Sequence, residues 1–70
     1  MSDEQRRVAY FAYAVEMYKK AKNLSGREAF FDLRRIGADQ YIYDMFELLH
    51  VHGTEYLLDE LDAYAASRAV

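Results

Sequence analysis

Apolar residues recur at intervals of three and four along almost the whole chain. This spacing places side chains on one face of an α-helix, and the alternation typical of β-strands does not develop. The chain has no proline and three glycines, so few residues interrupt helices. The pattern therefore predicts an all-α fold: a compact bundle of four short helices forming a single domain over residues 1–70.

The predicted helices span residues 3–22, 26–36, 39–49 and 55–67, each with an apolar face. The first helix is apolar over about half of its circumference, which is typical of a helix touched on several sides. Its predicted core positions are Val8, Phe11, Val15 and Tyr18, widened by Tyr10, Ala14, Met17 and Ala21. The second helix contributes Ala29, Phe30, Leu33 and Ile36 to the predicted core. The third contributes Tyr41, Ile42, Met45, Leu48 and Leu49, and the fourth contributes Leu57, Leu58, Leu61, Tyr64 and Ala65.

Local signals mark the predicted connections between these helices. Ser25 with Glu28 three residues later matches a capping box at the start of the second helix. Gly37 is suited to the left-handed backbone that ends many helices. After residues 50–53, Thr54 is expected to cap the last helix.

Length favours association with a partner, and the charge distribution leaves two interpretations open: an interaction surface, or attraction between the two halves within one fold. A chain of 70 residues buries only roughly 60% of the surface that its unfolded form exposes. Residues 1–35 carry eight Lys or Arg against five acids, a net charge of +3, whereas residues 36–70 carry one Arg against seven acids, a net charge of -6. No apolar run approaches the ~20 residues of a membrane helix, and residues 1–7 lack the apolar stretch that makes a secretory signal. We expect a cytoplasmic protein that does not associate with membranes.

Catalytic chemistry has few candidate residues in this chain. Without cysteine, thiol nucleophiles and thiolate zinc sites are excluded, and the three serines lie near the ends or at a predicted cap. We therefore predict no catalytic residue, cofactor or metal ion. The alternative is a metal-dependent or acid-base enzyme centred on His50 and His52, with Glu47 or Glu55 as a third ligand. If the two histidines form no such site, one of them packs or hydrogen-bonds at the turn and the other is solvated.

Aromatic and acidic residues on the polar helix faces favour contact with another protein. Tyr13, Tyr43, Tyr56 and Phe31 all fall on predicted polar sides. An acidic stripe of Glu55, Asp59 and Asp62 on the last helix is suited to a basic partner surface, or is a plain solvated face. Two alternatives remain: a homodimer, and a DNA-binding regulator, which the net negative charge opposes. The regulator would use Lys19, Lys20, Arg27, Arg34 and Arg35.

Short motifs in a fixed order resemble a family of small bacterial proteins, domain of unknown function 3791. They are Asn23-Leu24-Ser25-Gly26, Gly37 with Asp39, Tyr41 and Ile42, Leu49-His50-x-x-Gly53, and Leu57-Leu58-Asp59-Glu60-Leu61. The resemblance implies no established enzyme activity. It also implies a neighbouring gene for a protein similar to ADP-ribosyltransferases, as in a toxin–antitoxin pair.

The leading hypothesis combines these observations in a non-enzymatic helical module that binds another bacterial protein, such as one similar to ADP-ribosyltransferases. Binding would block or scaffold that partner. The predicted partner-binding residues are Tyr43, His50, His52, Glu55, Tyr56, Asp59 and Asp62.

Overall fold

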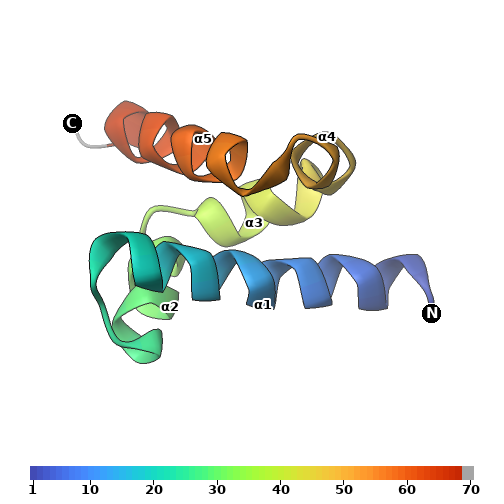
Figure 1. Ribbon diagram of the computed structural model, residues 1–70, viewed down its shortest axis with the longest axis horizontal. Coiled ribbons are helices and arrows are strands. Elements are labelled where there is room, and N and C mark those ends of the chain that lie inside the picture. The colour runs from blue at the N-terminus through green and yellow to red at the C-terminus, as the bar shows by residue number, and fades with distance from the viewer. Residues whose placement is uncertain (69–70) are drawn as a thin grey trace.

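The computed structural model describes residues 1–68, and these form five helices and no strand. They are α1 (Asp3–Lys22), α2 (Gly26–Arg35), α3 (Ala38–Asp44), α4 (Phe46–Val51) and α5 (Gly53–Arg68). Figure 1 shows α3 between α1 and α5, with α2 beside the C-terminal half of α1 and α4 at the start of α5. The predicted all-α fold is confirmed, with one of the predicted helices divided in two.

Helix α1 is the central element, as its broad apolar face predicted. It contacts all four other helices. At its start, the Ser2 hydroxyl accepts a hydrogen bond from the Gln5 amide, and the Gln5 side chain accepts one from the Ser2 amide. At its end, Asn23 adopts a left-handed backbone with φ of 56°. Both ends are therefore satisfied locally, which frees the helix faces for packing.

The predicted start and end of α2 are confirmed. The Ser25 hydroxyl accepts from the Glu28 amide at 3.1 Å, and the Glu28 carboxylate accepts from the Ser25 amide at 2.8 Å. Gly37 follows the helix with φ of 79°. A Cβ atom at Gly37 would lie 3.5 Å from the Tyr64 hydroxyl, an ordinary contact. The left-handed backbone, rather than lack of space, therefore favours glycine here.

The prediction of one helix over residues 39–49 was wrong at Met45. This residue leaves the helical region (φ −99°, ψ 15°), ends α3 and precedes α4. The break changes which side chains face inward: Phe46 is buried with its ring 5.4 Å from that of Tyr10, whereas Leu48 is 41% exposed. The sequence pattern had placed Leu48 in the core and had not used Phe46.

The last helix begins at Gly53, two residues earlier than predicted, with φ of 84° at that glycine. Thr54 therefore lies inside the first turn, where its hydroxyl hydrogen-bonds to that of Tyr13 on α1. Two predicted core positions on α1 are also wrong, since Val8 and Ala21 are exposed. The buried core consists of Ala14, Tyr18, Ala29, Leu33, Ala38, Ile42, Phe46, Leu49, Leu57 and Leu61.

Candidate functional site

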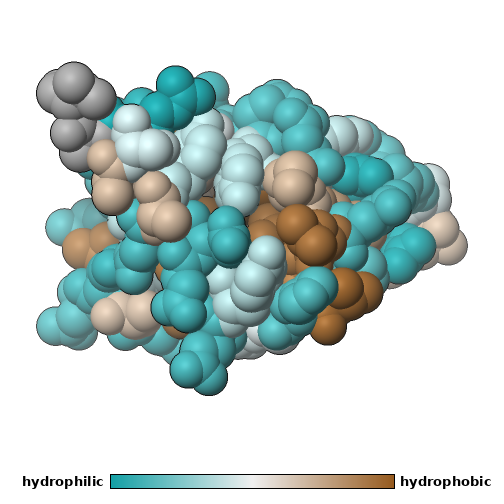
Figure 2. All heavy atoms as spheres, turned by 90° about the horizontal axis from the view of Figure 1, so that it is seen from above, coloured by the Kyte–Doolittle hydropathy of each residue, from teal (hydrophilic) through white to brown (hydrophobic). Residues whose placement is uncertain are grey.

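Helix α4 presents two apolar side chains to solvent. Phe46 and Leu49 take the inward positions of this short helix, and Leu48 and Val51, three residues apart, are left outside. Val51 is 65% exposed, more than most large apolar residues of the chain. Figure 2, which looks down on α4 and α5, shows apolar side chains gathered toward the α4 end of this face. We call the surface formed by Leu48, His50, Val51, His52, Glu55 and Asp59 the α4–α5 corner.

The two histidines at this corner are tied to their own helix. Nδ1 of His50 donates to the Phe46 carbonyl and Nδ1 of His52 to the Leu48 carbonyl, both at 2.9 Å. The His50 ring stacks on Phe46 at 4.5 Å, and the His52 ring lies 4.6 Å from that of Tyr56. Among residues 1–68, no three His, Asp or Glu side chains gather as metal ligands would. The histidines therefore hydrogen-bond to carbonyls of α4, and within the described residues neither Glu47 nor Glu55 joins them in such a group.

The acidic stripe on α5 is divided between free and paired carboxylates. Glu55 and Asp59 are exposed and form no ion pair within residues 1–68. Asp62 instead lies 2.7 Å from the Lys22 ammonium and links α5 to the end of α1. Glu55 and Asp59 are thus the members available to a cationic partner.

The structure places the two predicted interface tyrosines in different contacts. Tyr56 is partly buried and lies beside His52. Burial is the main cause that raises the pKa of Tyr56, and the nearby Glu60 carboxylate raises it further. Tyr43 faces α1, where its hydroxyl donates to Glu4, the main cause of its raised pKa. Tyr56 therefore borders the α4–α5 corner, whereas Tyr43 belongs to the junction of α3 with α1.

Arg7 organises this junction, a role that the sequence did not indicate. Its side chain is only 15% exposed and lies 2.8 Å from Asp3 and 3.4 Å from Glu47. It also donates to the Tyr43 carbonyl and lies against the Tyr43 and Phe46 rings. The hydrogen bond to Asp3 is the main cause that raises the pKa of Arg7. One cation thus joins α1 to both α3 and α4.

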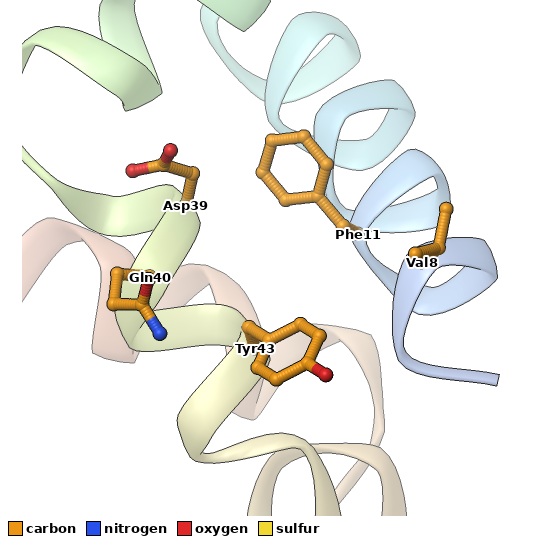
Figure 3. A pocket seen from close by; sticks show the side chains of 5 residues that line it. All are labelled: Val8, Phe11, Asp39, Gln40 and Tyr43. Carbon is orange, nitrogen blue, oxygen red and sulfur yellow. The ribbon is translucent and has the colours of Figure 1, made fainter. Parts of the chain in front are cut away.

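A hollow of about 280 Å³ opens between α1 and α3. It is lined by Val8, Phe11, Asp39, Gln40 and Tyr43, and Figure 3 shows Phe11 and Tyr43 projecting from the two facing helices toward the space between them. Its walls are mainly apolar, with one carboxylate and one amide at the rim, which suits an apolar side chain. Val8 and Phe11 were recognised in the sequence as apolar positions of the first helix, but they were predicted to lie in the core and not to line a hollow.

Most cations predicted for DNA binding are occupied by carboxylates of the same chain. Lys19 and Lys20 both lie near Glu16, at 3.6 and 3.9 Å. Arg34 and Arg35 lie near Asp39 and Asp32, respectively. Arg27 instead stacks over the Phe31 ring at 5.6 Å. A phosphate backbone would have to compete with these carboxylates for the cations.

None of the helices in residues 1–68 has the length and hydropathy of a membrane span.

The comparisons with known proteins assign a family. No match was found among curated proteins or solved structures. A family model described as a protein of unknown function, DUF3791, matches residues 9–68. This match covers most of the 70 residues and agrees with the resemblance of the sequence motifs, so the chain belongs to the DUF3791 family.

Proposed function

We propose that this protein is a non-enzymatic binding module that docks another protein through the α4–α5 corner. The observation that carries the proposal is the exposure of Leu48 and Val51 on one short helix, followed directly along the chain by α5 with the exposed carboxylates of Glu55 and Asp59. An apolar centre with a polar rim is the usual anatomy of a protein interface. The matching partner surface is apolar at its centre and basic at its edge.

The hydrogen bonds of the histidines support this role by fixing the surface in advance. Because His50 and His52 both hold carbonyls of α4, the helix end is ordered before a partner arrives. A preformed surface loses less conformational entropy on binding. The carboxylates of Glu55 and Asp59 would speed encounter with a cationic partner and select against acidic ones.

We further propose that the partner is a bacterial protein similar to ADP-ribosyltransferases, whose action in the cytoplasm is blocked by the complex. This proposal is supported by the resemblance of the sequence motifs to the family, which implies a neighbouring gene for such a protein. The α4–α5 corner supplies the chemistry of the contact.

The test is co-purification of the partner with variants of the corner. Val51→Asp should weaken the complex by about tenfold or more, because it places a charge at the centre of the apolar contact. Ala12→Asp is the matched control, since Ala12 is an exposed residue of α1 and belongs to neither α4 nor α5. Helical circular dichroism should be unchanged in both. Undiminished binding by a Leu48→Asp, Val51→Asp double variant would refute the assignment of this surface.

A further inference from the structure

A second apolar surface is formed by the N-terminal half of the chain, across α1 and α2. Val8 is 56% exposed and Phe31 is 54% exposed. The rings of Phe11 and Phe30 lie 6.1 Å apart, and those of Phe30 and Phe31 lie 5.5 Å apart, so aromatic contacts run from α1 to the outside of α2. We call the surface formed by Val8, Phe11, Phe30 and Phe31 the aromatic face. The hollow between α1 and α3 lies within it, because Val8 and Phe11 line both.

The two ends of the aromatic face carry opposite charges. At the α2 end, the guanidinium groups of Arg27 and Arg34 lie 5.6 and 5.8 Å from the centres of the Phe31 and Phe30 rings. At the other end are Glu4, in the first turn of α1, and Asp44, the last residue of α3. Their carboxylates accept hydrogen bonds from Tyr43 and Gln40, which line the hollow. Figure 1 shows α2 beside the C-terminal half of α1, away from the N-terminus where Glu4 lies.

We infer that the aromatic face is a two-fold interface with a second copy of this chain. A two-fold rotation about an axis midway between Phe31 and the hollow reverses the direction of the face. It brings the basic α2 end of one copy to the acidic end of its partner. Phe31 of one copy then enters the hollow of the other, and the same contact forms a second time by symmetry.

Charge complementarity is the reason for assigning a second copy as the occupant. The face presents both an exposed knob, Phe31, and a hollow, together with cations at one end and carboxylates at the other. A uniformly acidic partner would be repelled by Glu4 and Asp44, and a uniformly basic one by Arg27 and Arg34. Arg34 lies 3.8 Å from its own Asp39, and a guanidinium has further N–H groups to offer across the interface. This inference is independent of the partner proposed for the α4–α5 corner.

The first test is the molar mass in solution by light scattering over a range of protein concentrations. The wild-type chain should have twice its monomer mass of 8.2 kDa. Phe31→Asp should raise the dimer dissociation constant by about tenfold or more, since a charge then replaces the central apolar contact. Val51→Asp, the same kind of change at an exposed apolar residue of α4, should leave the dimer intact. Because Phe31 is exposed, helical circular dichroism should not change.

A charge swap tests the geometry of the dimer. The Arg27→Glu, Arg34→Glu variant and the Glu4→Lys, Asp44→Lys variant should each be monomeric, because like charges then meet at both ends. When the two variants are mixed, opposite charges face each other again at both ends, so a heterodimer should form. A monomeric wild-type chain at its highest soluble concentration would overturn the inference. A dimer that survives Phe31→Asp, or a charge-swapped mixture that stays monomeric, would overturn it as well.

Discussion

The aromatic face and the α4–α5 corner both expose large apolar side chains, but their charges differ. The aromatic face has arginines at one end and carboxylates at the other, whereas the corner carries the unpaired carboxylates of Glu55 and Asp59. A face with both signs is complementary to itself, and a face with one sign requires a different partner. If both proposals hold, a chain of 70 residues carries two interfaces that do not compete.

The largest expected effect on stability is that of a substitution in the buried core, on which both faces depend. Leu49 is fully buried beneath the corner and belongs to the same core cluster as Leu33 of α2. Leu49→Ala should lower the free energy of unfolding by about 2–5 kcal/mol, because it removes apolar contacts and leaves a cavity. Urea unfolding followed by circular dichroism measures the loss. If the change were below about 1 kcal/mol, the α4 position would not be part of a single core.

Substituting the glycines between the helices should have the next largest effect on the stability of the fold. Gly37 and Gly53 have φ of 79° and 84°, so alanine at either position is strained. Gly37→Ala and Gly53→Ala should each destabilise the fold by about 1–2 kcal/mol. Gly26→Ala is the matched control, because Gly26 lies in a helix with open space around it and should be neutral or slightly stabilising. Equal thermal midpoints for all three variants would contradict the assigned backbone.

Alkaline titration should distinguish Tyr18, which is buried, and Tyr10, which is partly buried, by their late ionisation. Burial, with a smaller effect of Tyr13, raises the pKa of Tyr10 to about 12. Burial and the hydrogen bond to Asp32 raise the pKa of Tyr18 to about 12. Since the folded pKa exceeds the unfolded value of about 10, their contribution to stability is complete below pH 10 and is lost as the pH rises through 12. Absorbance at the phenolate band should show both ionising late, and Tyr10→Phe and Tyr18→Phe should each remove one late step.

A smaller effect is expected in acid at the Tyr18–Asp32 contact beneath the aromatic face. The Tyr18 hydroxyl donates to Asp32 at 2.6 Å, and this bond, followed by the one from Arg35, lowers the pKa of Asp32. A lowered folded pKa gives stability that is present above the unfolded value of about 3.9 and is lost as the pH falls through the folded pKa. Tyr18→Phe should therefore shift the midpoint of acid unfolding upward. An unchanged midpoint of acid unfolding in Tyr18→Phe would contradict this contribution of the hydrogen bond.

Local signals made much of the fold predictable. The capping box of Ser25 and Glu28 and the left-handed Gly37 depend on neighbouring residues only, and both are confirmed. The break at Met45 has no proline or glycine to mark it, so the continuous helical spacing hid it. Its result, with Phe46 buried and Leu48 exposed, follows from packing against α1, which periodicity does not describe.

The candidate sites were less predictable for the same reason. The free carboxylates of Glu55 and Asp59 could be expected from a polar helix face, and both are exposed. Phe31 could also be expected outside, because it falls on a predicted polar face, and it is exposed. The exposure of Val8, which was predicted to be core, depends on where α2 and α3 end along α1, and the role of Arg7 depends on a residue 40 positions away in the chain. Contacts of this kind arise only when the helices are assembled.

The molar mass of the complex with the proposed partner tests the separation of the two interfaces most directly. The wild-type chain should form a complex with two copies of each protein, and Phe31→Asp should reduce it to one copy of each. Val51→Asp should remain a dimer of this chain that no longer holds the partner. If Phe31→Asp abolished partner binding, or Val51→Asp abolished the dimer, the two faces would be one interface and the account would be wrong.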